Sequence, residues 1–126
     1  MPKKQSFLSE VEHTPTGKEK RHLRIVITDP DNDQNQVVVS VTTLKYESQD
    51  NSCVLKPGEH PFIKEESIVD FKRTRVMSYL QIFNGIQKGL LIRKDDVSDD
   101  LLRRIQVAAS NSKYISDEIK NMFIYF

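Results

Sequence analysis

Hydrophobic and polar positions alternate with a strand period through the middle of the chain. Residues 23–28 (LRIVIT) and 37–44 (VVVSVTTL) are rich in β-branched residues, and the segment between them, DPDNDQNQ, consists of turn formers. This arrangement predicts an antiparallel hairpin. Residues 53–55 predict a short strand, and residues 67–76 (SIVDFKRTRV) predict a long strand that places Phe71, Arg73 and Arg75 on one face.

The period becomes helical after residue 78. Apolar residues at helical spacing predict a helix over 79–88 that Gly89 terminates, and residues 90–92 predict a last short strand. Ser98 and Ser116 precede acidic residues and are typical N-caps of two C-terminal helices. Strands first and helices later indicate an α+β fold, with a small, strongly bent antiparallel β-barrel followed by helices.

The length of 126 residues suits one domain. Residues 1–20 lack a clear period and predict an irregular N-terminal arm, in which 6–11 is a possible weak strand. Residues 21–126 predict a single barrel-plus-helix domain.

Composition favours a cytoplasmic protein. No apolar run approaches the roughly 20 residues of a membrane helix, and the N-terminal lysines have no apolar segment behind them, so we expect neither a membrane span nor a secretory signal. The single cysteine, Cys53, cannot form an intramolecular disulfide.

Charge is distributed unevenly, although the net charge is only +1. Residues 1–24 carry six basic and three acidic side chains, and residues 56–94 carry eight and four, whereas 25–55 and 95–126 are acidic. A protein that binds nucleic acid along one face has this pattern, and so do many proteins with random charge scatter. Both interpretations remain open at this point.

Metal and phosphate-loop motifs are not supported. The acidic run from Asp29 has calcium-loop spacing, but Gln34 stands where the loop needs glycine and Ser40 where it needs the bidentate acid. The three histidines lie far apart, and neither a glycine-rich phosphate loop nor a nucleophile elbow is present. We therefore expect no metal and no cofactor, which leaves metal-free chemistry, binding or an interaction role.

Basic and hydroxyl side chains lie at the ends of several predicted strands, where a bent barrel can bring them to one rim. They are Arg21, Thr42, Thr43, His60, Arg73 and Arg75. Taken singly, each has an ordinary alternative as a β-former, a turn residue or a solvated strand edge.

Together these groups suit RNA. Arginine can hold a phosphate and stabilise charge that develops on it, a threonine hydroxyl can position the phosphate, and histidine can transfer a proton near neutral pH. Cleavage by the neighbouring 2′-hydroxyl group needs such groups and no metal. We expect Arg21 and Thr42 to act on the phosphate, His60 to transfer a proton, and Thr43, Lys72, Arg73 and Arg75 to bind the strand.

The order of these features resembles the PemK/MazF-like toxin family of toxin–antitoxin systems, over about residues 17–110. The matching segments are Gly17-Lys18-Glu19 before Arg21 and its apolar strand, Val39-Ser40-Val41-Thr42-Thr43, Glu66-Ser67-Ile68-Val69, Arg73-Thr74-Arg75, and Ile86-Gln87-Lys88-Gly89 before the helix capped by Ser98.

The resemblance implies an SH3-like barrel that forms a homodimer, cleaves single-stranded RNA without a metal and is blocked by a small antitoxin protein. The family's catalytic arginine and threonine fall on Arg21 and Thr42, and a later arginine falls on Arg75. The sequence departs from the family at His22, which replaces a proline, and at Lys72, which replaces an acid. A non-catalytic barrel that binds nucleic acid or protein is the alternative.

Overall fold

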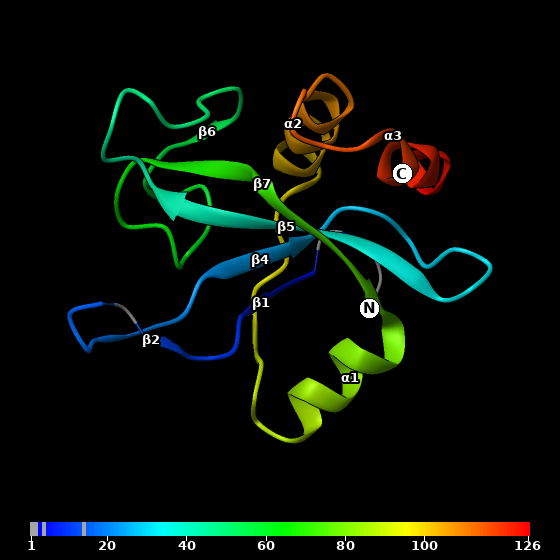
Figure 1. Ribbon diagram of the computed structural model, residues 1–126, viewed down its shortest axis with the longest axis horizontal. Coiled ribbons are helices and arrows are strands. Elements are labelled where there is room, and N and C mark those ends of the chain that lie inside the picture. Colours follow the sequence, from blue (N-terminus) through cyan, green and yellow to red (C-terminus); the bar gives the residue numbers. More distant parts are fainter. Residues whose placement is uncertain (1–2, 4, 14) are drawn as a thin grey trace.

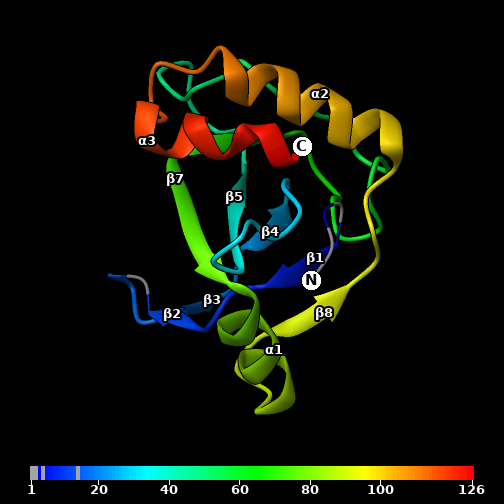
Figure 2. The same cartoon turned by 90° about the vertical axis from the view of Figure 1, so that its right-hand side faces the viewer.

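Six antiparallel strands form one curled sheet with helices at two opposite ends (Figure 1). The structure is a computed structural model that describes residues 3, 5–13 and 15–126. The order of the strands across the sheet is β6-β7-β5-β4-β1-β8. Their bounds are β1 (Ser6–Leu8), β4 (Leu23–Val26), β5 (Asn35–Thr43), β6 (Val54–Leu55), β7 (Ser67–Ser78) and β8 (Ile92–Lys94). Figure 2 shows the sheet curling into a half-barrel beneath the C-terminal helices.

Smaller elements complete the described part of the chain. A separate two-stranded hairpin pairs β2 (Glu12–His13) with β3 (Glu19–Lys20). The helices are α1 (Tyr79–Gln87), α2 (Asp99–Ser110), α3 (Asp117–Lys120) and the 3-10 helix η1 (Asn121–Tyr125). The predicted α+β class, with a strongly bent antiparallel sheet and C-terminal helices, is confirmed. None of the helices in the described residues has the length and apolar character to cross a bilayer.

The predicted hairpin is present as β4 and β5, which pair from Leu23 opposite Val41 to Val26 opposite Val38. Its turn is closed by Asp31, whose Oδ1 accepts the backbone N–H groups of Asp33 and Asn35 at 2.9 Å each. The acidic run is therefore built as an aspartate-capped turn.

A wide bulge interrupts β7 where it faces β5. Asp70 pairs with Ser40 and Arg75 pairs with Val38, so residues 71–74 lie opposite a single residue of β5. Side chains of a regular strand alternate between the two faces of the sheet. Because the excess of three residues is odd, the residues after the bulge lie on the face opposite to the one that counting from Phe71 would give.

This reversal separates Arg75 from Phe71. Phe71 is fully buried in the core on the α2 side, whereas Met77, which has the same parity as Arg75, packs with Phe7 in the core on the α1 side. The prediction that Phe71 and Arg75 share a face is wrong, because strict alternation does not continue through the bulge.

Each side of the sheet has its own apolar core. The larger core contains Ile25 and Phe71 and is covered by Leu101 and Ile105 of α2. The smaller core packs Phe7 of β1 against Ile82 of α1. A serine caps each of the three α-helices, and its side chain accepts the backbone N–H group of the third helical residue. Ser98 and Ser116 have this role as predicted, and Ser78 has it in α1.

The N-terminal arm and the last strand differ in detail from the sequence prediction. The weak strand expected within residues 6–11 is present as β1, which lies between β4 and β8 and is buried, and residues 12–13 and 19–20 add a hairpin that the sequence did not indicate. The last strand begins at Ile92 instead of residue 90. The N–H groups of Leu90 and Leu91 are instead bound to the carbonyl of Gly85, which completes the end of α1.

Candidate functional site

Arg21, Thr42 and Thr43 line one open groove at the end of the β4–β5 hairpin. The groove has a volume of about 360 Å³, and we call it the threonine groove. Thr43 lies opposite Ser67 of β7, so the groove floor comes from adjacent strands. Its lining residues are Lys20, Arg21, His22, Leu23, Val41, Thr42, Thr43, Phe62, Ile63, Lys64, Glu65 and Ser67.

The Arg21 guanidinium is anchored at the edge of this groove. Arg21 lies between β3 and β4, where the chain leaves strand geometry. Nη1 donates to the carbonyl oxygens of Ser9 at 3.2 Å and Leu90 at 3.0 Å. A guanidinium has five N–H donors, so these bonds orient the group and leave donors for a ligand.

A second hollow, of about 410 Å³, lies between the β2–β3 hairpin and the sheet, and we call it the hairpin cavity. Thr42 and His22 line this cavity as well as the threonine groove, so the two hollows meet at these residues. The other lining residues are Glu12, His13, Pro15, Lys20, Gln49, Asp70 and Arg73.

Charged groups connect the hairpin to the sheet inside this cavity. Glu12 Oε2 of β2 lies 3.4 Å from Nε2 of His22 and 3.7 Å from Nη1 of Arg73. Arg73 Nη1 also lies 3.4 Å from His22 Nε2, and its Nε lies 3.6 Å from the Asp70 carboxylate. Arg73, a predicted RNA-binding residue, is therefore paired with two acids.

His22 is buried, and burial lowers its pKa below the ordinary histidine value. The negative charge of Glu12 raises the pKa in part, and the positive charges of Lys20 and Arg73 lower it. The imidazole is consequently neutral at pH 7, and a neutral imidazole can accept a proton.

His60 lies outside both hollows and is fully engaged in structural hydrogen bonds. Its Nδ1 accepts the N–H of Phe62 at 3.0 Å, so the proton resides on Nε2, which donates to the carbonyl of Asp95 at 2.7 Å. Nε2 also lies 3.1 Å from the hydroxyl of Ser6. Because the ring is buried and ties β1 to the segment after β8, we do not place His60 in the site.

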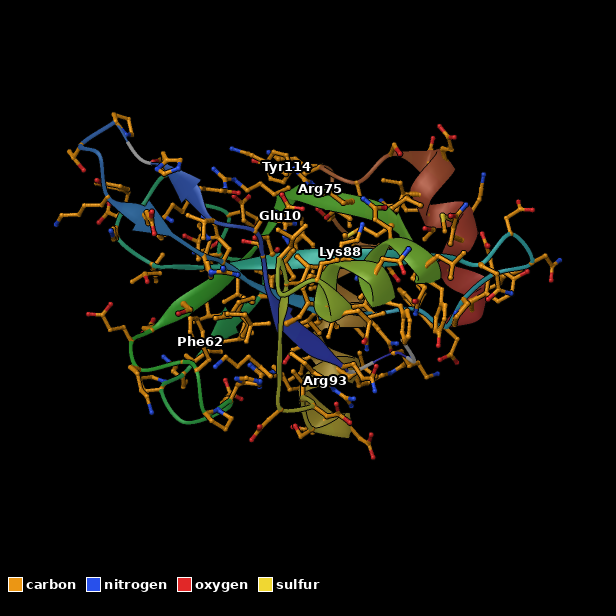
Figure 3. All side chains as sticks on the ribbon, turned by 90° about the horizontal axis from the view of Figure 1, so that it is seen from below. Glu10, Phe62, Arg75, Lys88, Arg93 and Tyr114 are labelled. Carbon is orange, nitrogen blue, oxygen red and sulfur yellow. The ribbon has the colours of Figure 1, made fainter. Side chains whose placement is uncertain are left out.

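Lys72 and Arg75 also lie apart from the threonine groove. Lys72 is in the bulge of β7, and its Nζ sits 4.8 Å above the ring of Tyr114, beyond the end of α2. Arg75 is exposed after the bulge, on the side of the sheet that Figure 3 views, and lines a separate hollow beside Glu10. The described part of the chain therefore does not bring Arg21, Thr42, Thr43, His60, Arg73 and Arg75 to the single rim that the sequence predicted.

Sequence reasoning missed His22 and Glu12. A signal for His22 was available, because His22 and Arg24 alternate with Leu23 and Ile25 and so must face away from the larger core. Glu12 had no such signal, since its position depends on how the hairpin folds back over the sheet.

The arrangement offers cationic donors, a hydroxyl group and a neutral imidazole around adjoining hollows, which is chemistry suited to a phosphodiester. Comparison with known proteins adds no family: no protein-family model matches the chain, and no curated protein matches it.

Proposed function

We propose that this protein is a metal-independent endoribonuclease that cleaves single-stranded RNA in the threonine groove. The observation that carries the proposal is that Arg21, Thr42 and Thr43 line one groove with Lys20 and Lys64. The resemblance to PemK/MazF-like toxins selects Arg21 and Thr42 independently of this geometry.

Each group has a role in cleavage by the 2′-hydroxyl group. Arg21 holds a non-bridging phosphate oxygen and stabilises the negative charge that grows on it, and the Thr42 hydroxyl donates to the same phosphate. The neutral imidazole of His22 accepts the 2′-hydroxyl proton as the 2′-oxygen bonds to phosphorus. The bond to the 5′-oxygen breaks, that oxygen takes a proton from water, and a 2′,3′-cyclic phosphate remains.

Glu12 and Arg73 support the imidazole in this scheme. The Glu12 carboxylate stabilises the imidazolium that forms when His22 takes the proton, while Arg73 disfavours protonation before the reaction begins. His22 thus takes the proton-transfer role that the sequence analysis gave to His60.

The family resemblance supplies the biological setting of the proposal. We propose that the half-barrel is an SH3-like PemK-type barrel, that the protein acts in the cytoplasm as the homodimeric toxin of a toxin–antitoxin pair, and that a small antitoxin protein blocks the groove. Acidic residues of the antitoxin would contact Lys20, Arg21 and Lys64 in the groove.

A non-catalytic barrel that binds nucleic acid or protein is the second candidate. The pairing of Arg73 with both Glu12 and Asp70 favours its protein-binding form, because that pairing reduces the positive charge available to hold an RNA strand.

An RNA-cleavage assay in EDTA separates the two candidates. The wild-type chain, an Arg21→Ala/Thr42→Ala double variant and a His22→Gln variant are incubated with single-stranded RNA, and fragment ends are identified by mass spectrometry. Lys88→Ala, which removes an exposed charge at the end of α1, is the matched control.

The proposal expects cyclic-phosphate ends from the wild type and from Lys88→Ala, and a rate loss of about 100-fold or more in the other two variants. Absence of cleavage with salt-sensitive RNA binding would favour the non-catalytic barrel. Cleavage that survives in the double variant would overturn the proposal.

A further inference from the structure

Arg24 is a buried arginine with an unsatisfied nitrogen. It lies in the middle of β4, only 4% of its surface is exposed, and its Nη1 has no hydrogen-bond partner among the described residues. Buried polar groups in proteins are almost always hydrogen-bonded, and a buried charge is normally paired. The described part of the fold therefore leaves Nη1 of the Arg24 guanidinium without an acceptor.

Ser40 presents a second unsatisfied group beside Arg24. The two residues are directly opposite in the β4–β5 ladder, so their side chains leave the same face of the sheet next to each other. Ser40 is fully buried, and its Oγ has no hydrogen-bond partner among the described residues. The two unsatisfied groups therefore lie on the face of the sheet that also carries Arg75.

Two neighbouring arginines, Arg75 and Arg73, place positive charge near Arg24. Arg75 follows the bulge of β7 opposite Val38, which places it diagonally from Arg24 across β5. Burial lowers the pKa of Arg24, and the positive charge of Arg75 lowers it further. The nearby Glu12 carboxylate offsets this only in part, because it pairs with His22 and Arg73.

Arg24 and Arg75 line a hollow of about 270 Å³ between the N-terminal segment and α1. Its polar lining also includes Ser9, Glu10, Glu12 and Gln81. Figure 3 shows Glu10 and Arg75 near each other on this side of the molecule. The volume lies below the roughly 300 Å³ at which pockets for drug-sized ligands begin, so it suits one small group.

We propose that Arg24 and Arg75 form a phosphate-binding site, and that its ligand is a phosphodiester of an RNA strand that also occupies the threonine groove. The Arg24 guanidinium donates to a phosphate oxygen, and Arg75 supplies the second charge at the mouth of the site. The identification of the ligand as RNA rests on the proposed function; the affinity for phosphate does not.

Two carboxylates in the same hollow oppose phosphate binding. Glu10 and Glu12 repel an incoming phosphate, so they weaken binding and select for a ligand that is held elsewhere on the protein as well. Replacing Glu10 with glutamine should strengthen phosphate binding, whereas loss of a cation should weaken it. These opposite signs distinguish a specific site from general attraction to a basic surface.

The first test titrates inorganic phosphate into the full-length chain at constant ionic strength, with the arginine side-chain N–H signals followed by NMR. The proposal expects saturable shifts of the Arg24 and Arg75 signals. It also expects affinity to fall at least about fivefold in Arg75→Gln and to rise in Glu10→Gln. Arg103→Gln, which removes an exposed arginine from α2, is the matched control and should bind as the wild type does.

Arg75 is the principal test position because it is exposed, so its replacement leaves the fold intact. Arg24→Met tests the buried partner, since the methionine retains much of the arginine side-chain length without the unpaired charge. Phosphate affinity that stays unchanged in both variants, or an equal loss in Arg103→Gln, would overturn the site.

The second test measures binding of a 2′-O-methyl RNA strand, which cannot be cleaved, as a function of salt. Loss of one phosphate contact in Arg75→Gln should reduce the slope of log affinity against log salt by about one, and Arg103→Gln should leave it unchanged. A phosphate-dependent shift with an unchanged RNA slope would overturn RNA as the ligand. Absence of RNA cleavage with an intact phosphate titration would overturn only the proposed activity.

Discussion

The Glu12 carboxylate lies 3.4 Å from His22 Nε2 across the gap between the β2–β3 hairpin and the sheet. Glu12 also faces Arg73 at 3.7 Å, so one hairpin side chain contacts two residues that line the hairpin cavity. The placement of the hairpin over this cavity is therefore coupled to the charge of a small group of side chains.

Replacement of Glu12 by glutamine should loosen the hairpin with little effect on global stability. Glu12 and its partner Arg73 are about half exposed, and such ion pairs contribute up to about 1 kcal/mol. We expect hydrogen exchange of residues 10–20, measured by mass spectrometry, to become several-fold faster. Glu66→Gln, which removes a pair with exposed Lys56, is the control. Unchanged exchange over residues 10–20 would show that other contacts hold the hairpin.

His22 should make the protein less stable as the pH falls below neutrality. Burial lowers the folded-state pKa of His22 from its ordinary value of 6.5, so the unfolded chain binds this proton more readily than the folded protein. Stability is then complete above the unfolded pKa and decreases as the pH falls from there toward the lowered folded pKa.

The measurement is urea unfolding at pH 7.5 and pH 5.5. The wild type should lose more of its free energy of unfolding between these values than His22→Gln does, since the variant has no group at this position to titrate. Equal losses in the two proteins would contradict the prediction.

His60→Ala should act on stability and not on chemistry. The substitution removes a buried ring and leaves the Asp95 carbonyl and the Phe62 amide without their partner, which should cost about 2–4 kcal/mol in urea unfolding. His13→Ala, on the exposed hairpin, should stay within about 0.5 kcal/mol of the wild type. A folded His60→Ala protein with wild-type stability and no RNA cleavage would return His60 to the active site.

Phe7→Ala should show that the N-terminal segment belongs to the domain. Phe7 is fully buried in the smaller core, and truncation of such a residue costs about 3–5 kcal/mol. Val11→Ala changes a residue that is 37% exposed in the same segment and should cost under about 0.5 kcal/mol. Similar unfolding midpoints in urea for both variants would contradict the role of β1.

The β4–β5 hairpin and the helix caps could be predicted because their signals are local. The turn after Thr28, and Ser98 before its helix, lie within a few residues of the partners they bind. The grouping of Arg21 with Thr42 follows from the same hairpin, since its register places the end of β5 beside the start of β4.

Features that depend on distant partners could not be predicted. His60 binds Ser6 and Asp95, which lie 54 and 35 residues away. β1 has only three residues, and its pairing with β4 and β8 has no signature in its own sequence. Arg24 faces away from the larger core, but its own strand gives no signal that the N-terminal segment buries it.

The bulge in β7 makes the two halves of this strand independent of each other in length. Because pairing with β5 resumes at Arg75 opposite Val38, an insertion or deletion within residues 71–74 would change the size of the bulge and leave Arg75 and Met77 on their present side. One extra residue in the paired part, between Arg75 and Met77, would instead turn Met77 away from Phe7. We therefore expect homologous chains to vary in length within residues 71–74, with the arginine kept at a constant distance in sequence from the start of α1.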